Sequence, residues 1–170
     1  MPVQTLFGAG YPNPTSVIKP PKALFGRARV NALKAEFPVD ANVSANSYLL
    51  VGRVPTGAIL MRASTMICTA LTTGVINLGL DRRGALSSSN LYVPSSGAQA
   101  AALLSAQSIA TAGAFPALAA VSVANLDAEV WRLLGLTSDP GDMAAIYATV
   151  STAATVSGTL AFEMLCATED

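Results

Sequence analysis

The fold class is decided by the stretch Thr159-Leu-Ala-Phe-Glu-Met-Leu-Cys-Ala167, in which strongly apolar residues occupy every second position. An extended chain turns successive side chains to opposite faces, so the even-numbered residues from Leu160 to Cys166 share one face. That pattern is typical of a strand in a sheet with a core on one side. A second strand-like stretch, Ala144 to Thr152, precedes it across a six-residue linker. We therefore predict that the chain ends as an antiparallel hairpin.

Short strands are also predicted in the first half of the chain, each bounded by turn residues. Turns are expected at Pro55-Thr-Gly57 and at Thr72-Thr-Gly74. No stretch between the strands is long enough for a helical crossover, which favours an antiparallel β-sandwich over a parallel α/β sheet. The expected strands cover Arg29 to Val39, Ser47 to Val54, Ala58 to Thr69 and Val75 to Leu80.

The middle of the chain has a different pattern. Gly97 to Ala112 is rich in alanine and is followed by Gly113, which predicts a short helix. Ala114 to Val123 could form a strand, but Pro116 confines it to a sheet edge or to irregular structure. Asp127 suits the N-cap of a helix that runs to Leu134, with Gly135 at its C-terminal end.

Residues 1–28 contain five prolines and three glycines, a density that precludes a regular helix. We interpret this segment as an extended N-terminal arm and residues 29–170 as one domain, for which 170 residues in all are sufficient. The alternative is a disordered, solvated tail. An arm that becomes ordered against a neighbouring molecule is favoured because the segment is unusually apolar, with Leu6, Phe7, Tyr11, Val17, Ile18, Leu24 and Phe25.

The composition indicates a protein that hides much of its surface. Hydrophobic residues make up 52% of the chain and charged residues 12%, about half the charged share of an ordinary soluble domain. Charge is also uneven: the residues before Glu36 include five basic side chains and no acidic one, whereas residues 127–170 include seven acidic side chains and one basic one. Opposite ends of neighbouring copies would therefore attract each other.

The sequence argues against a membrane span and against a secretory signal. The longest charge-free stretch, Gly84 to Leu126, is interrupted by polar residues, glycine and proline, which argues against a membrane span. The first ten residues have no basic start and no sustained apolar centre, so we expect no secretory signal. Cys68 and Cys166 lie on candidate strands without CxxC spacing and are expected to be buried, reduced thiols, as in a reducing cytoplasm.

Catalysis is a poor hypothesis because the chain contains no histidine, the commonest general base and metal ligand. Two carboxylate pairs remain, Asp127 with Glu129 and Asp139 with Asp142. Helix capping and turn formation explain them more simply. A calcium site at the second pair has only two carboxylates and lacks the regular spacing of a calcium loop. We expect no enzyme activity, no cofactor and no metal.

Nucleic-acid binding and sugar binding also have weak signals. Gly8-Ala-Gly10 lacks the third glycine and the flanking strand and helix of a phosphate-binding loop. The adjacent Arg82 and Arg83 are typical of a solvated turn, so no nucleic-acid partner is expected. Trp131 is the only tryptophan, flanked by aliphatic residues; core or interface packing is the favoured interpretation, and a sugar-binding platform is the alternative.

Two stretches of the sequence have a familiar pattern. One is Tyr48-Leu-Leu-Val-Gly-Arg-Val-Pro-Thr-Gly-Ala-Ile-Leu60, followed by Thr73-Gly-Val-Ile-Asn-Leu-Gly-Leu80. The other is Trp131-Arg-Leu-Leu-Gly-Leu-Thr-Ser-Asp-Pro140, followed by Val150 to Gly158 and Thr159 to Cys166. The first resembles structural proteins of tailed bacteriophages, and the second resembles the closing hairpin of the same group. The resemblance extends over the chain from about residue 30 to residue 170 and leaves the arm outside it.

The resemblance implies an all-β jelly-roll β-sandwich with one or two short helices, used as a capsid decoration or cement protein. It further implies a homotrimer on the outside of the virion whose partner is the major capsid protein of the same virus. Rival interpretations are a head-tail joining or tail protein, and a sugar-binding host-attachment protein that uses Trp131 or Tyr92. The candidate interaction residues are Leu6, Phe7, Tyr11, Leu24 and Phe25 as apolar anchors, Lys19, Lys22, Arg27 and Arg29 as partners for an acidic surface, and Trp131.

Overall fold

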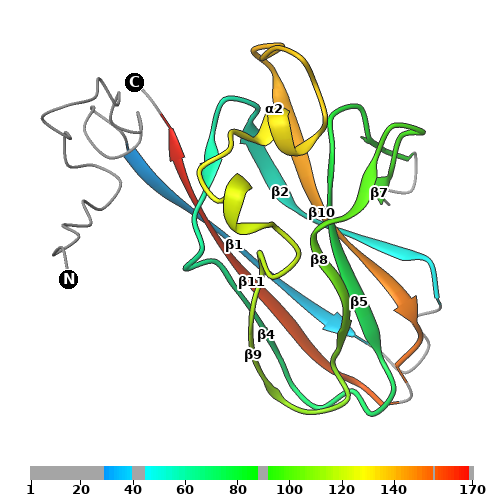
Figure 1. The fold of residues 1–170 in the computed structure, drawn as a ribbon. Helices are drawn as coiled ribbons and strands as arrows, with labels where there is room; N and C mark the ends of the chain where they lie inside the picture. Colours follow the sequence, from blue (N-terminus) through cyan, green and yellow to red (C-terminus); the bar gives the residue numbers. More distant parts are fainter. Residues whose placement is uncertain (1–28, 40–44, 88–91, 155, 169–170) are drawn as a thin grey trace, which may run out of the picture.

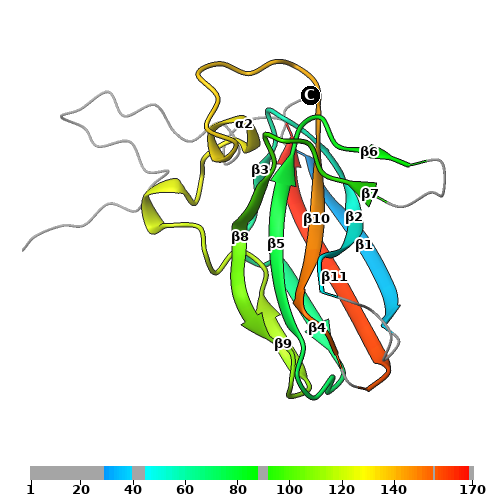
Figure 2. The same cartoon turned by 90° about the vertical axis from the view of Figure 1, so that its right-hand side faces the viewer.

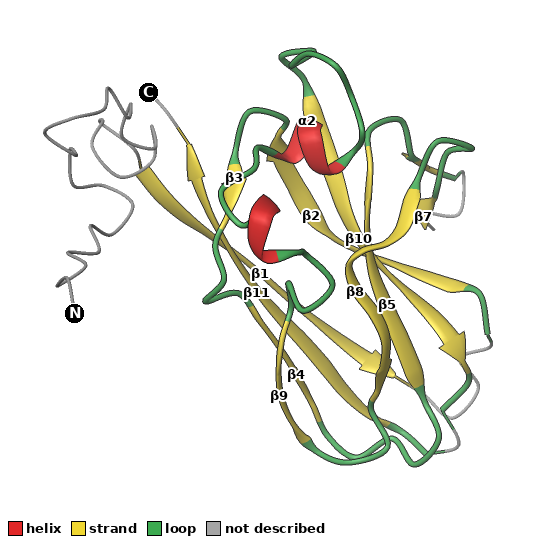
Figure 3. Ribbon diagram, in the orientation of Figure 1, coloured by secondary structure: helices red, strands yellow, loops and turns green. Residues whose placement is uncertain are grey.

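The computed structural model describes residues 29–39, 45–87, 92–154 and 156–168, which form two antiparallel sheets packed face to face (Figures 1 and 3). We call them the β1 sheet and the β2 sheet. In strand order, the β1 sheet contains β1 (Arg29–Val39), β11 (Gly158–Thr168), β4 (Thr65–Cys68) and β9 (Gly113–Pro116), and β3 (Ile59–Leu60) also pairs with β11. The β2 sheet contains β2 (Ser47–Pro55), β10 (Met143–Thr152), β5 (Val75–Asp81) and β8 (Gln99–Ser108).

Three small elements join this sandwich. A two-stranded flap, formed by β6 (Ala85–Leu86) and β7 (Tyr92–Val93), is inserted between β5 and β8. A 3-10 turn, η1 (Val123–Asn125), and a single helical turn, α2 (Val130–Leu133), lie between β9 and β10. Figures 1 and 2 place α2 at one end of the sandwich and the turns that join β4 to β5 and β8 to β9 at the other end.

The strand order is that of a jelly roll. Eight strands make up the two four-strand paths given above. Along the chain, successive strands of this set lie in different sheets at every connection except that from β5 to β8. Two interlocked Greek keys of this kind define the jelly-roll sandwich. The all-β fold class and the antiparallel jelly roll expected from the sequence are therefore confirmed.

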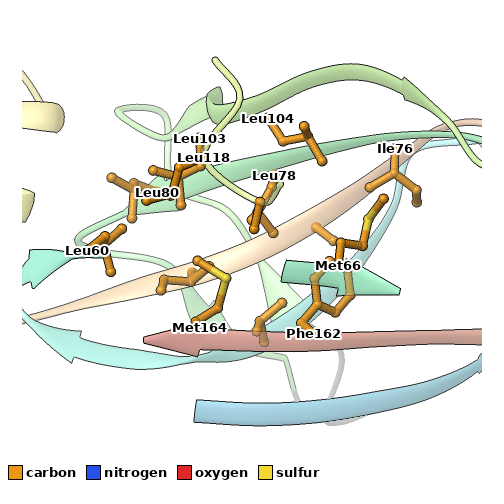
Figure 4. Packing of buried hydrophobic residues seen from close by; sticks show 14 of the residues in the cluster. Leu60, Met66, Ile76, Leu78, Leu80, Leu103, Leu104, Leu118, Phe162 and Met164 are labelled. Atoms are coloured by element: carbon orange, nitrogen blue, oxygen red, sulfur yellow. The ribbon is translucent and has the colours of Figure 1, made fainter. Parts of the chain in front are cut away.

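The core lies between the two sheets and is built from the alternation visible in the sequence. Leu160, Phe162 and Met164 of β11 are buried, while Ala161 and Glu163 between them are partly exposed. The side chains of Phe162 and Met164 point toward the opposite sheet, where Leu78 and Leu80 of β5 lie (Figure 4). Burial of one face of each strand on the other sheet is the main source of stability of such a sandwich.

The predicted terminal hairpin is wrong, although both strands are present. β10 pairs with β2 and β5 in the β2 sheet, whereas β11 pairs with β1, β3 and β4 in the β1 sheet. The linker after Thr152 therefore bridges the two sheets, which lie about 10 Å apart in sandwiches. All seven residues from Ala144 to Val150 are buried, because β10 lies in the middle of the β2 sheet, with the main core on its inner face and the cluster around Tyr92 on part of its outer face.

The helix predicted for Gly97 to Ala112 is also wrong, because most of this stretch is the edge strand β8. Alanine has the highest helix propensity, but helix propensity is a weak influence and pairing with β5 overrides it. The backbones of β5 and β8 approach closely, since a Cβ atom on Gly79 of β5 would lie 2.4 Å from the carbonyl oxygen of Gln99. β8 also carries register shifts, and Ala106 has a φ of 49°.

The predicted helix from Asp127 to Leu134 is reduced to the single turn α2. Its N-cap residue is Glu129, not Asp127, because the N–H groups of Val130 and Trp131 donate to carbonyl groups of the β2–β3 turn. Gly135 ends the turn as predicted, with a φ of 74°. The N–H group of Gly135 donates to the Arg132 carbonyl, and the N–H group of Leu136 donates to the Trp131 carbonyl. This pair of hydrogen bonds is a Schellman motif.

Two smaller differences concern the β1 sheet. The strand expected from Ala58 to Thr69 is divided into β3 and β4 by a turn in which the N–H of Ser64 donates to the Met61 carbonyl. The strand expected from Ala114 ends at Pro116 and lies at the sheet edge, as the proline requires. The N-terminal arm, residues 1–28, lies outside the described residues, so the division into arm and domain stays a prediction.

Candidate functional site

Trp131 is held at one end of the sandwich by the backbone around it. The N–H groups of Val130 and Trp131 donate to the carbonyl oxygens of Ala58 and Thr56 over 2.8 and 2.9 Å. Val130 is fully buried, while the indole of Trp131 is partly exposed and the Arg132 guanidinium lies 4.9 Å from the centroid of its ring system. The site therefore holds one partly exposed aromatic side chain on a turn whose backbone is bonded to the β2–β3 turn.

The loop that carries Asp139 and Asp142 is fastened to the turn beside it. The carboxylate of Asp139 accepts hydrogen bonds from the Thr56 hydroxyl (2.5 Å) and the N–H of Gly141 (2.9 Å). These bonds, the one from Thr56 first, hold the pKa of Asp139 below its ordinary value. The turn-forming role predicted for this carboxylate is confirmed by its bond to Gly141.

Arg82 takes part in the same region and is not merely a solvated turn residue. Its Nε donates to the Asp142 carboxylate over 2.6 Å, so it ties the end of β5 to the beginning of β10. In the ranges that the structure describes, no three histidine, cysteine, aspartate or glutamate side chains come close enough to hold a metal ion together. The acidic loop therefore uses its carboxylates for contacts within the chain.

A second site lies on the outer face of the β2 sheet, below the flap. Tyr92 of the flap is buried and packs its ring on Tyr147 of β10, with ring centroids 5.3 Å apart. Tyr48 of β2 approaches Tyr147 edge-on from the other side at 6.2 Å. Tyr92, Tyr147 and Ala145 form a small apolar cluster separate from the main core, and Leu50 and Ala98 pack against it. Figure 2 looks onto this sheet, with β8, β5, β10 and β2 in order from left to right and the flap at the right.

Asp81, at the end of β5, locks the flap onto the sheet. It has no exposed surface and accepts four hydrogen bonds, from Arg83 N–H (3.0 Å), the Tyr92 hydroxyl (2.9 Å), Ser95 N–H (2.7 Å) and the Ser95 hydroxyl (2.6 Å). Burial acts to raise the pKa of this carboxyl, but the four bonds outweigh it and the pKa lies below the ordinary value. Asp81 is therefore an ionised, fully bonded structural group.

The two buried tyrosines stay neutral beside this carboxylate. Burial and then the charge of Asp81 raise the pKa of Tyr147 to about 12. Burial also raises the pKa of Tyr92, and its hydrogen bond to Asp81 adds to the shift. Both phenols consequently keep their protons over the whole physiological range.

Beside the flap lies a hollow of about 500 Å³, which we call the outer-sheet hollow. Its floor consists of side chains from three neighbouring strands. Thr149 of β10 is paired with Tyr48 of β2 on one side and with Asn77 of β5 on the other. Val93, the last residue of the flap, and Pro94 after it supply part of the wall of the hollow. The lining as a whole is aromatic, aliphatic or neutral polar: Asn46, Tyr48, Asn77, Val93, Pro94, Ser95, Ala98, Ala100, Tyr147, Thr149 and Ser151.

Two polar groups in the floor are unusual. The side-chain oxygen of Asn77 accepts a hydrogen bond of 2.7 Å from the N–H of Ala106, the residue with positive φ in β8. Thr149 is 7% exposed, and its hydroxyl oxygen has no hydrogen-bond partner in the described part of the chain. A buried hydroxyl without a partner costs about 1–3 kcal/mol, so this position is a weak point of the sheet on its own.

The sequence-predicted interaction residues are only partly placed by the structure. Arg29 begins β1 opposite Thr168, and Trp131 lies in α2; neither lines the outer-sheet hollow. Tyr92, the second sugar-binding candidate, is buried between the flap and Tyr147 of β10 and cannot offer its face to a ligand. The remaining candidates lie outside the described residues: Leu6, Phe7, Tyr11, Lys19, Lys22, Leu24, Phe25 and Arg27.

Sequence reasoning missed the outer-sheet hollow. Tyr48, Asn77 and Thr149 each occupy an outward position of a correctly predicted strand, which was the available signal. Their assembly into one site depends on β2, β10 and β5 being neighbours, and the alternation within a strand does not specify its neighbours.

The cysteine prediction is confirmed, since Cys68 and Cys166 are both buried and unpaired in a disulfide. Burial raises the pKa of both thiols. Within the described ranges, the structure has no helix with the length and apolar character to cross a bilayer.

Comparison with known proteins gives a likeness of fold. No family model matches the chain, and no curated protein matches its sequence. A chain in the structure "Capsid of Ralstonia phage GP4" superposes with a TM-score of 0.55 at 12% identity, over 84% of this chain and 85% of that chain. A chain in "Cyanophage Pam1 capsid asymmetric unit" gives 0.47 at 16% identity, over 92% and 96%. At these identities, the Ralstonia phage match establishes a shared fold.

Proposed function

We propose that this protein is a non-enzymatic structural component of a bacteriophage virion that decorates and stabilises the outside of the capsid. The observation that carries the proposal is the jelly roll, shared over 84% of the chain with a chain in a structure entitled as a phage capsid. A fold alone does not define a function, so the surface and composition must supply further support.

The outer face of the β1 sheet has the properties of a contact surface. Ile67 of β4 is 50% exposed at its centre, and Val30 of β1 is 60% exposed. Around Ile67 lie the small side chains of Ala114 and Ala161 in neighbouring strands. Charged side chains border this apolar patch: Lys34 and Glu163 are paired at 3.1 Å, and Glu36 lies beside them. An exposed apolar patch with a charged border is typical of a contact surface between proteins.

The edge of the same sheet offers a second mode of contact. β1 is eleven residues long, and in the described part of the chain its only strand partner is β11. The open edge of such a strand is a template for pairing with an extended segment of another molecule. The apolar arm of residues 1–28 from a neighbouring copy has the composition for this role.

In this proposal the protein self-associates as a trimer and binds the major capsid protein of the same virus. Leu6, Phe7, Tyr11, Leu24 and Phe25 would anchor the arm in apolar surface, while Lys19, Lys22, Arg27 and Arg29 would face acidic groups. Trp131 would add an anchor at the α2 end. A ligand that binds only the assembled shell stabilises that shell by mass action.

The direct test is the copy number in purified virions, measured by mass spectrometry relative to the major capsid protein. Decoration of the shell predicts hundreds of copies per particle. A dozen copies or fewer would instead indicate a head-tail joining or tail protein.

The arm has its own test, in which residues 1–28 are deleted and oligomer mass and capsid binding are measured. The proposal predicts loss of one or both. An unchanged mass together with unchanged capsid binding would refute the role of the arm.

A further inference from the structure

We propose that the outer-sheet hollow is a binding site for a neutral saccharide, with the ring of Tyr48 stacked on one sugar unit and Asn77 and Thr149 bonded to its hydroxyl groups. This inference goes beyond capsid decoration and does not depend on it. It rests on the charge, the aromatic surface and the unpartnered polar group of the hollow.

The lining excludes charged ligands and fits polyhydroxylated ones. Among the residues that the structure describes, no lysine, arginine, aspartate or glutamate lines the hollow, so an anionic or cationic ligand would lose its hydration without gaining a counter-charge from them. The nearby carboxylate of Asp81 is fully buried and committed to its four donors. A neutral sugar instead combines apolar C–H faces with hydroxyl groups, and the lining offers both kinds of partner. At about 500 Å³, the hollow lies within the size range of small-ligand sites.

Tyr48 provides the stacking surface. It is 38% exposed, while Tyr147 behind it is buried and holds it in an edge contact at 6.2 Å. The ring is therefore oriented before a ligand arrives, which reduces the entropy lost on binding. The negative face of an aromatic ring attracts the positive C–H groups of a sugar.

Asn77 and Thr149 provide the hydrogen bonds. The bond from Ala106 N–H occupies the amide oxygen of Asn77 and fixes its orientation, so the amide nitrogen is the group that donates to a ligand. Thr149 lies between Asn77 and Tyr48 in the pairing register, and its buried hydroxyl has no partner in the described residues. Thr149 lines the hollow, and in another staggered χ1 rotamer its hydroxyl group would turn toward the ligand. A sugar hydroxyl there would remove the cost of the unsatisfied group.

The test begins with the full chain on an array of neutral and acidic glycans. The affinity for the best neutral ligand is then measured by titration calorimetry or ligand-observed NMR for wild type and for Tyr48→Ala, Tyr48→Phe and Thr149→Val. Thr65→Val, the same substitution on the opposite sheet, is the matched control. We expect about tenfold weaker binding for Tyr48→Ala and Thr149→Val, a smaller loss for Tyr48→Phe, and no change for Thr65→Val.

Thermal unfolding separates binding from folding. Thr149→Val removes an unsatisfied hydroxyl and keeps the shape of the side chain, so its Tm should equal or exceed that of wild type even though its affinity falls. The inference is overturned if no neutral glycan binds at millimolar concentration, if only acidic glycans bind, or if the hollow variants bind as wild type does. Because this assay uses the isolated protein, its failure leaves the capsid proposal standing, and failure of capsid binding leaves this site standing.

Discussion

Replacement of Asp81 by asparagine should destabilise the protein by about 3 kcal/mol. The carboxylate receives two donors on each oxygen, one backbone N–H and one hydroxyl, from Arg83, Tyr92 and Ser95. Asparagine turns one of the oxygens into an N–H₂ group, whichever way the amide is oriented. The hydroxyl on that side can rotate and accept, but the backbone N–H cannot, so one bond is lost and the remaining bonds lose their charge-assisted strength. Bonds to a charged group contribute about 1.5–3 kcal/mol each, and neutral ones about half of that.

The pH dependence of the same variant gives an independent readout. The pKa of Asp81 is lower in the folded state than its ordinary value of about 3.9. The carboxylate therefore contributes its full stabilisation above pH 4, and this contribution is lost as the pH falls through the folded-state pKa. The difference between wild type and Asp81→Asn should be largest at pH 7 and should shrink as the pH falls below 4.

Urea unfolding at a fixed protein concentration, followed by tryptophan fluorescence from pH 3 to pH 7, measures both quantities. The matched control is Asp127→Asn, the same change at an exposed aspartate, which should alter the unfolding free energy by less than about 0.5 kcal/mol. Tyr92→Phe removes one charge-assisted bond and should cost about 1.5 kcal/mol. If Asp81→Asn unfolds at the same urea concentration as the control, the carboxylate does not hold the flap and the reasoning fails.

Three further outcomes are expected. Gly79→Ala should destabilise by about 2 kcal/mol or more, since its Cβ would collide with the backbone of β8; an unchanged urea midpoint would refute that close approach. Leu78→Ala in the core should cost about 3 kcal/mol, whereas Val123→Ala, on a residue 75% exposed, should cost less than about 0.5 kcal/mol; equal losses in the two unfolding curves would contradict the assigned core. Cys68 and Cys166 should react with a thiol reagent only after unfolding, since both are buried with raised pKa values; rapid labelling of the native protein would contradict their burial.

Strands with one buried face were predictable from the sequence. The bounds of β1 and β5 were predicted to within one residue, because apolar alternation ends at glycine, proline or an acidic residue there. β8 was mistaken for a helix because its alanines give no alternation of apolar and polar residues. Its extended conformation comes from pairing with β5, whose Gly79 has no side chain in the way of the β8 backbone. The alternation of apolar residues along the chain therefore identified most strands but did not specify which strands pair with each other.

The same limit applies to the candidate sites. Trp131 could be singled out as a candidate anchor because it is a single aromatic side chain among aliphatic ones, and this role stays a prediction. The outer-sheet hollow could not be found, since Tyr48, Asn77 and Thr149 become neighbours only when β10 lies between β2 and β5. The terminal hairpin failed for the same reason, because short linkers are compatible both with hairpins and with crossings between sheets.

The most direct test of the proposed capsid role is cryo-electron microscopy of bare particles of the parent virus, imaged before and after addition of the purified protein. We predict new density at symmetry-related positions on the outer shell, into which the β1 and β2 sheets fit as a sandwich. Bare shells at saturating protein concentration, with the protein remaining as a free monomer, would contradict the account.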